Sequence, residues 1–495
     1  MKQSSRPLRN LSFLFSSGSG NLLFLFATGF YLILLSSCKK DYVLISPAKI
    51  TVGQGVKPGN ICGAVKGTML SDSVYNVTCD IIINSGDTLL IQPGAKIYFT
   101  GNYNFWIHGN LLSLGTQAKP IWFTVKDLQK NDVIGQDPTT DNAYKGTWGG
   151  LQGDSSTQFM IIKWTHVEFA GGVIGVAQTF GTKNGSAAGP VTFVNPTGIF
   201  VFEDSWIYGG VDGGASLNLK SGLIDVMRNT FEKAGFTGGE SVGVGNGTQG
   251  TVAYNLSIGP STNSIKVSNG KAILSQANIV SYNNTLLNGG YRRFLYGGAG
   301  NSLGRGGSFD LESGAAGEAY NNLMVDSRFG FRIVGTSSYL GNNLVIADTA
   351  HCRYGYNYSY GDDPAMTNQF YPTNFLTNPQ PTDIPAPGSF LPPGYTLGSI
   401  YDGSSLVGQN DPQFVNYPLP ISYAGTTVDA KLATMSFIGN YDFHLKSSSP
   451  CIGKGTTNFP LLNVVPTDPI YGATEITPPG KDMGCYQVNG TGNKH

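Results

Sequence analysis

Pairs of apolar residues recur at a nearly constant step between positions 81 and 123. The two residues of each pair are two positions apart, which is the spacing that places strand side chains on one face. The pairs follow one another about every eight residues and are separated by turn formers such as Ser85-Gly86-Asp87. Three such strands make a rung of roughly 24 residues, a period that indicates a solenoid. The pairs are Ile81/Ile83, Leu89/Ile91, Ile97/Phe99, Phe105/Ile107, Leu112/Leu114 and Ile121/Phe123.

The composition also favours a chain of many short strands. Glycine accounts for 68 of the 495 residues, and charged residues make up only 13%. Long surface helices are usually rich in Lys and Glu, so this composition disfavours them. The formal net charge is zero, so there is no basic field that would attract nucleic acid. A solenoid can accommodate such a long chain because each repeat contacts only its neighbours.

Residues 1–37 have the organisation of a bacterial secretion signal. Three basic residues precede an apolar run, Leu22 to Leu35, that is shorter than the ~20 residues of a membrane span. The run ends in Leu35-Ser36-Ser37-Cys38, which resembles the lipoprotein box, in which the cysteine is lipidated. The resemblance implies that Cys38 anchors the protein to outer-membrane lipid, as in surface-exported lipoproteins of Bacteroidetes-type bacteria. An uncleaved membrane anchor is the alternative interpretation.

Residues 86–99 read GDTLLIQPGAKIYF, and residues 109–124 read GNLLSLGTQAKPIWFT. Both segments resemble the N-terminal rungs of right-handed parallel β-helix proteins with the pectin-lyase-like fold. The resemblance implies an all-β protein, folded as a single-stranded right-handed parallel β-helix solenoid with inserted loops. It implies almost nothing about the substrate, because one fold can support many functions.

The rhythm of the chain also predicts its division into parts. The prolines between Pro364 and Pro393 are too dense for regular strands, so the solenoid is expected to break there. The predicted parts are a signal peptide (1–37), a tether (38–60), the β-helix (61–350), an irregular insertion rich in Pro and Tyr (351–435), and final rungs with a C-terminal cap (436–495).

An asparagine-containing turn precedes several of the later apolar alternations. It occurs as Arg228-Asn229-Thr230 and as Asn283-Asn284-Thr285, and it recurs at Asn321-Asn322 and Asn342-Asn343. Stacked asparagine side chains can hydrogen-bond to one another from rung to rung. We therefore interpret these asparagines as structural.

The cysteines fit an exported protein. With Cys38 assigned to the lipid, five of the six cysteines remain, so one thiol is left over if the others pair. The positions predict two local disulfides, Cys62–Cys79 and Cys451–Cys485, and a free, buried Cys352. The alternative is that all five are ordinary small core residues.

One strand carries two carboxylates between its apolar residues. In the segment from Ser308 to Glu312, Phe309 and Leu311 are expected to point inward, so Asp310 and Glu312 point outward with Cα atoms roughly 6.5–7 Å apart. About one rung later, Arg328 and Arg332 have outward parity. Such a column would suit a glycoside hydrolase, or a lyase that removes the C5 proton of a uronic acid. The alternative is a set of exposed ion pairs, each worth ~0–1 kcal/mol.

Four alternating tyrosines form a second candidate site. In an extended chain they would share one face and could form a carbohydrate platform, or they could seal the loop against the solenoid. Asp362 and Asp363 follow and could bind calcium, the one cofactor that the sequence suggests. Cysteine and histidine show no spacing typical of a transition-metal site. The tyrosines are Tyr354, Tyr356, Tyr358 and Tyr360.

Together these features predict a lipid-anchored protein of the cell envelope whose β-helix contacts polysaccharide or another envelope component. The first alternative is a polysaccharide lyase or glycoside hydrolase acting near Asp310. The second alternative is a structural or adhesion module of the cell surface. The sequence leaves the oligomeric state open.

Overall fold

The computed structural model describes most of the chain from residue 53 onward. The signal segment, Cys38 and the start of the tether lie outside the described residues, as do Arg328, Asn342-Asn343, Asp362-Asp363 and most of the insertion. The described ranges are 53–130, 137–174, 185–217, 222–269, 275–290, 292–293, 307–327, 331–333, 347–360, 411–416 and 441–495.

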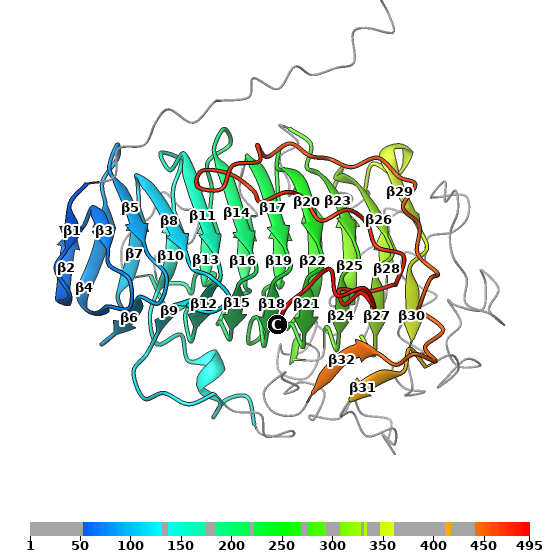
Figure 1. Cartoon of the computed structure of the whole chain (residues 1–495), viewed down its shortest axis with the longest axis horizontal. Coiled ribbons are helices and arrows are strands. Elements are labelled where there is room, and N and C mark those ends of the chain that lie inside the picture. Colours follow the sequence, from blue (N-terminus) through cyan, green and yellow to red (C-terminus); the bar gives the residue numbers. More distant parts are fainter. Residues whose placement is uncertain are drawn as a thin grey trace, which may run out of the picture. The chain divides into compact units, whose positions relative to one another are not determined.

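The strands form three parallel stacks that run along one axis (Figure 1), so the predicted parallel β-helix is confirmed. Each full rung contributes one short strand to each stack. Sheet A has 11 strands: β1 (Gly55–Val56), β3 (Gly67–Met69), β5 (Thr88–Ile91), β8 (Asn110–Leu114), β11 (Phe159–Lys163), β14 (Ile199–Glu203), β17 (Leu223–Met227), β20 (Gln249–Ala253), β23 (Asn278–Tyr282), β26 (Ala316–Tyr320) and β29 (Cys352–Gly355).

The other two stacks are joined at one end by two long strands, β2 (Gly59–Ala64) and β4 (Val74–Ile83). The first half of β4 pairs with β6 and its second half pairs with β7. We call these stacks sheet B and sheet C. Sheet B continues with β6 (Lys96–Phe99), β9 (Ile121–Thr124), β12 (Thr165–Glu168), β15 (Trp206–Tyr208), β18 (Thr230–Glu232), β21 (Leu256–Ile258), β24 (Thr285–Leu287), β27 (Leu323–Val325) and β30 (Tyr358–Tyr360). Sheet C continues with β7 (Asn104–Ile107), β10 (Gly150–Gly153), β13 (Val191–Phe193), β16 (Ala215–Leu217), β19 (Val242–Val244), β22 (Asn263–Ser268), β25 (Gly307–Glu312) and β28 (Phe331–Ile333).

Inward side chains stack on their counterparts in the next rung and fill the interior. In sheet A, Leu89 pairs with Leu111, and Gly317 of β26 pairs with Cys352, which is a free, buried thiol in this core as predicted. The predicted pair Leu112/Leu114 is wrong by one residue. Leu111 points inward instead, while Leu112 is buried on the outer face of sheet A under a later part of the chain.

The corner between sheets A and B is built by an asparagine ladder, as the sequence predicted for Asn229, Asn284 and Asn322. Asn284 Oδ1 accepts hydrogen bonds from the main-chain N–H of Asn255 at 2.9 Å and from Asn255 Nδ2 at 3.0 Å. The same two bonds join Asn229 to Asn255, Asn284 to Asn322, and Asn322 to Asn357. Each side chain therefore satisfies a buried N–H that the turn removes from the sheet.

The residue before each ladder position has a left-handed backbone. Asparagine tolerates this conformation better than most residues, which explains Asn283 and Asn321, whereas the aromatic and charged examples are held by their surroundings. The ladder carries the backbone out of sheet A and into sheet B within two residues. The positive φ values along this corner are those of Trp164 (47°), Asp204 (48°), Arg228 (58°), Tyr254 (56°), Asn283 (50°), Asn321 (57°) and Tyr356 (54°).

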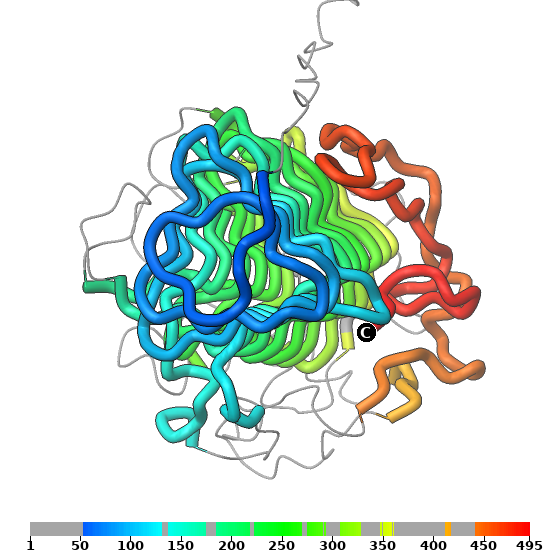
Figure 2. Tube along the Cα trace, turned by 60° about the vertical axis from the view of Figure 1, so that its left-hand side comes forward, coloured from blue at the N-terminus to red at the C-terminus, as the bar shows by residue number. Residues whose placement is uncertain are grey.

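Residues 441–495, which we call the lateral segment, do not add the predicted final rungs. Their strand β32 (Asp442–Leu445) pairs antiparallel with β31 (Phe414–Asn416). The segment then runs back along the side of the solenoid, as Figures 1 and 2 show in orange and red. Val464, Val465 and Ala473 pack on the outer face of sheet A, and Met483 and Tyr486 join a cluster with outward residues of sheet B.

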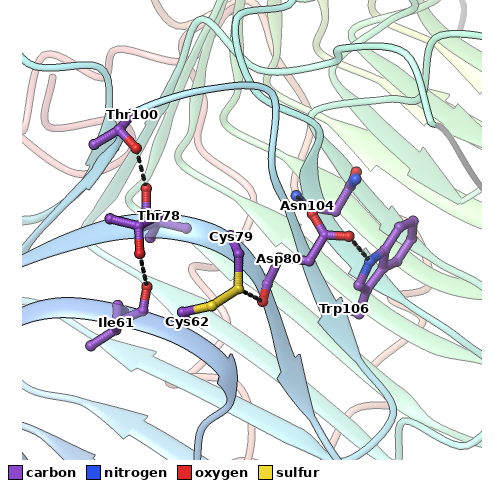
Figure 3. The surroundings of a disulfide bond; sticks show 9 residues. Ile61, Cys62, Thr78, Cys79, Asp80, Thr100, Asn104 and Trp106 are labelled. Carbon is purple, nitrogen blue, oxygen red and sulfur yellow. Dashed lines mark hydrogen bonds between the residues drawn. A yellow bond between two sulfur atoms is a disulfide. The ribbon is translucent and has the colours of Figure 1, made fainter.

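The first rungs are held by the predicted disulfide between Cys62 of β2 and Cys79 of β4 (Figure 3). It lies where the register between these two strands shifts. Next to it, the Asp80 carboxylate accepts hydrogen bonds from the Asn104 main-chain N–H and from Trp106 Nε1, both at 2.9 Å. The disulfide and Asp80 thus tie β2, β4 and β7 together at the point where sheets B and C separate.

Candidate functional site

The structure places the predicted carboxylates on the outer face of sheet C. Phe309 and Leu311 lie in the core, so Asp310 and Glu312 face the other side of β25. Asp310 pairs in register with Arg332 of β28. However, Asp310 is fully buried and Glu312 is only 7% exposed. A fully buried Asp310 is poorly placed to act on a polymer.

Lys266 of β22 is the centre of this charged group. Its Nζ lies 2.8 Å from the Glu312 carboxylate and 4.0 Å from that of Glu240, and its side chain is 24% exposed. Burial alone would lower the pKa of Lys266, but the charges of Glu312, Glu240 and Asp310 outweigh burial and raise it. Burial raises the pKa of Glu240, against the opposing effect of Lys266. The group is thus a partly open ion-pair network, of which the sequence had indicated Asp310 and Glu312 but neither Lys266 nor Glu240.

The four tyrosines do not form the predicted platform. Tyr356 has a left-handed backbone, so the chain turns between β29 and β30 and the tyrosines cannot share one face. Tyr354 packs in the core, and Tyr358 and Tyr360 are buried beneath the lateral segment. Only Tyr356 is partly exposed, so the prediction of an aromatic surface at these residues is wrong.

A different aromatic row lies on the outer face of sheet B. Trp122 of β9, His166 of β12 and Trp206 of β15 are in register on successive rungs and are all partly exposed. The Trp122 and His166 rings stack at 3.8 Å, and the His166 and Trp206 rings lie 5.5 Å apart. We call these three residues the aromatic row. The sequence analysis missed it because its members are 44 and 40 positions apart in the chain.

Charged side chains flank the aromatic row on the same face. Glu168, two positions after His166, accepts a hydrogen bond from the Thr124 hydroxyl at 2.9 Å and pairs with Lys130 at 2.6 Å. Lys130 Nζ lies over the rings of Trp206 and Tyr208, at 4.7 and 5.0 Å from their centroids. The row therefore combines apolar rings with one carboxylate and one ammonium group.

His166 remains neutral within the row. Burial, reinforced by the positive charge of Lys130, lowers the pKa of His166 well below its ordinary value. His495 stacks on Trp164 and contacts Trp206 edge-on, which closes one side of the row. Burial likewise lowers the pKa of His495, to about 4. Near pH 7 the two imidazoles therefore act as aromatic rings without charge.

A third charged group lies beneath the lateral segment and holds it in place. Arg228 forms a bidentate pair with Asp204 and lies 3.5 Å from Glu203, which is also 3.8 Å from Lys163. Burial and the neighbouring Glu203 carboxyl raise the pKa of Asp225 well above its ordinary value. Arg228 also donates to the hydroxyls of Thr474 and Thr477, and Glu203 accepts from the main-chain N–H and the hydroxyl of Thr474.

The predicted Cys451–Cys485 disulfide is not formed. Both residues are free, buried thiols in the cluster between sheet B and the lateral segment. Burial raises the pKa of Cys485 to about 12 against a hydrogen bond from Thr285, and Cys451 is likewise buried beside Ser449. Each cysteine serves as a small core residue, which was the alternative interpretation. Among the residues that the structure describes, no three His, Cys, Asp or Glu side chains gather closely enough to hold a metal ion.

Comparison with known protein families, curated proteins and solved structures finds no match to this chain. Across the described ranges, no helix has the length and apolar character needed to cross a membrane. The aromatic row and the Lys266 group are two partly exposed polar features whose geometry can indicate a function.

Proposed function

We propose that this protein is a lipid-anchored component of the bacterial cell envelope whose β-helix binds polysaccharide through the aromatic row on sheet B. The anchor rests on the lipoprotein-like motif that ends in Cys38. The observation that most supports polysaccharide binding is the partly exposed row of Trp122, His166 and Trp206, which lies beside the Glu168–Lys130 pair. Glycan sites typically combine aromatic side chains with a few polar groups of this kind.

The position of the row also suits an extended polymer. Rungs of a parallel β-helix are about 4.8 Å apart, so three successive aromatic residues span roughly two sugar units. The lateral segment covers the later rungs of sheet B, whereas the three rings of the row are partly exposed and His495 contacts only their Trp206 end. Lys96 and Tyr98 of β6 continue the same face by one rung and are not buried.

The proposal is tested by titrating the full chain, purified in detergent, with a panel of neutral, acidic and amino polysaccharide fragments. Binding would be followed by intrinsic tryptophan fluorescence and by calorimetry. Trp122→Ala should weaken binding by about 0.5–1.5 kcal/mol, or up to roughly ten-fold in Kd. Tyr471→Ala, which removes a partly exposed aromatic residue of the lateral segment, is the matched control. Equal binding by wild type and Trp122→Ala would refute the assignment of the row.

A second candidate function is glycan cleavage at the Lys266 group. Its support is Glu240, a carboxyl with a raised pKa that could act as a general acid, within about 7 Å of Glu312, a separation used by glycoside hydrolases. Incubation of the same panel with the full chain would reveal new reducing ends or an unsaturated product. Turnover that persists in Glu240→Gln would refute this role.

A further inference from the structure

The Lys130 ammonium group is enclosed by two aromatic rings and one carboxylate on the outer face of sheet B. Its Nζ lies 4.7 Å from the Trp206 ring centroid, 5.0 Å from that of Tyr208 and 2.6 Å from Glu168 Oε1. An ammonium group within about 6 Å of a ring centroid is attracted by the ring's quadrupole. We call Glu168, Trp206 and Tyr208 the ammonium cage.

The cage is held in shape by residues other than Lys130. The Thr124 hydroxyl donates to Glu168 Oε2 at 2.9 Å, and Trp148 Nε1 donates to the Glu168 main-chain carbonyl at 2.7 Å. Glu168 is 4% exposed and Tyr208 is fully buried. Because strand pairing and these bonds fix the cage, removal of the lysine would leave it formed.

The charges around the cage favour a cation. Glu168, Tyr208 and Glu232 are in register on successive rungs, so carboxylates stand on both sides of the Tyr208 ring. Lys233, whose ammonium group is 5.8 Å from that ring, is paired with Asp141 at 2.7 Å. The nearest charge to Lys130 is thus the Glu168 carboxylate, and His166 adds no positive charge because burial lowers its pKa.

We propose that the ammonium cage binds the protonated amine of an amino sugar, with Lys130 as the resident occupant that the ligand displaces. The inference rests on the proposed function and narrows its ligand to polysaccharides that carry free amino groups. Exchange of one ammonium group for another preserves the contacts of the cage, while the sugar adds contacts along the aromatic row. Lys130 can leave because its side chain is 22% exposed to solvent.

The test compares two oligosaccharides that differ only in this amine. A β-1,4-linked glucosamine tetramer and its fully N-acetylated counterpart are titrated by calorimetry into the full chain in detergent at pH 6. We expect the amino tetramer to bind at least ten-fold more tightly. Lys130→Met should strengthen its binding several-fold and widen the preference for the amino tetramer over the acetylated one. Lys66→Met, which removes an exposed lysine paired with Asp87, is the control and should change neither affinity.

Glu168→Gln removes the charge of the cage and should abolish the preference for the amine while circular dichroism shows an intact fold. If Glu168→Gln unfolds, the affinities of Lys130→Met for the two tetramers are sufficient to test the ammonium cage. Equal affinities for the two tetramers, in both wild type and Lys130→Met, would overturn the ammonium cage and leave glycan binding by the row intact. Failure of both tetramers and of every other glycan to bind would overturn the proposed function, and the cage with it.

Discussion

Replacement of Asn284 by alanine should destabilise the solenoid far more than replacement of an exposed asparagine. Asn284 accepts two hydrogen bonds from Asn255, and its Nδ2 donates to the Asn322 side chain at 2.8 Å and to the Val252 carbonyl at 3.0 Å. In Asn284→Ala the main-chain N–H of Asn255 loses its partner while it remains buried. Asn255 Nδ2 keeps a second acceptor, the Val226 carbonyl at 2.9 Å, so it is not orphaned.

The expected loss of stability in Asn284→Ala follows from the hydrogen bonds that this substitution removes. One orphaned buried donor costs about 1–3 kcal/mol, and each lost hydrogen bond between neutral groups costs about 1 kcal/mol net. Asn284→Ala loses this donor's bond and three others, so it should lower the free energy of unfolding by roughly 4–6 kcal/mol. Asn284→Ser should recover part of this loss, because Ser205 already occupies an equivalent position, where its Oγ accepts the Thr165 main-chain N–H at 3.0 Å.

The assay is urea unfolding followed by tryptophan fluorescence, with hydrogen exchange at the Asn255 amide as a local measure. Asn76→Ala is the control, because Asn76 makes an exposed side-chain bond to Asn60 at 3.3 Å and should cost at most about 0.5 kcal/mol. If Asn284→Ala and Asn76→Ala prove equally mild, or if exchange at Asn255 is unchanged, the ladder does not stabilise the corner as argued.

Asp225→Asn should stabilise the protein at pH 7 and have no such effect near pH 3. Burial and Glu203 raise the pKa of Asp225 above 3.8 in the folded state, so the wild type loses about 1.4 kcal/mol of stability per pH unit as the pH rises from 3.8 to this folded-state pKa. The urea midpoints of both proteins at pH 3 and pH 7 measure this difference. If Asp225→Asn is no more stable than wild type at pH 7, the pKa of Asp225 is not raised as described. Reduction of the Cys62–Cys79 disulfide, which joins residues 17 positions apart, should lower the free energy of unfolding by about 3 kcal/mol. An unchanged urea midpoint after reduction would show that the disulfide does not stabilise the first rungs. Burial raises the pKa of the Cys352 and Cys485 thiols to about 12 and also raises that of Cys451. An alkylating reagent should therefore modify these three thiols only after unfolding, as mass spectrometry would show. Rapid modification of Cys451 or Cys485 in the native protein would refute their burial.

The architecture was predictable because the same pattern of apolar residues and turns recurs in many rungs of the chain. The spacing of apolar pairs gave the rungs, and the recurring asparagine turn gave the ladder at Asn284 and Asn322. Asn255 was missed; it stands alone between Tyr254 and Leu256, without the second asparagine found beside Asn284 and Asn322. The first disulfide was also predicted, since Cys62 and Cys79 flank the first turn of the repeat.

The candidate sites were harder to predict because they depend on what lies outside the rungs. Alternation correctly placed Asp310 and Glu312 outward, but alternation does not tell whether an outward face is covered. The tyrosine platform failed because a left-handed residue, Tyr356, interrupts the assumed extended chain. Cys451 and Cys485 looked like partners because both lie in the last segment, yet each packs as a small apolar residue.

The return path of the lateral segment has a consequence for biogenesis. Arg228 contacts Thr477, 249 positions later, so rungs that emerge early from the ribosome acquire these partners only after the lateral segment has been synthesised. Until then the side chains of Leu112, Ile161 and Val201 form an exposed apolar surface on the outer face of sheet A. Nascent chains with such an apolar surface are vulnerable to aggregation, so a chaperone would have a defined binding surface during this interval. Docking of the lateral segment, rather than completion of the solenoid, is then the step that removes this surface from solvent.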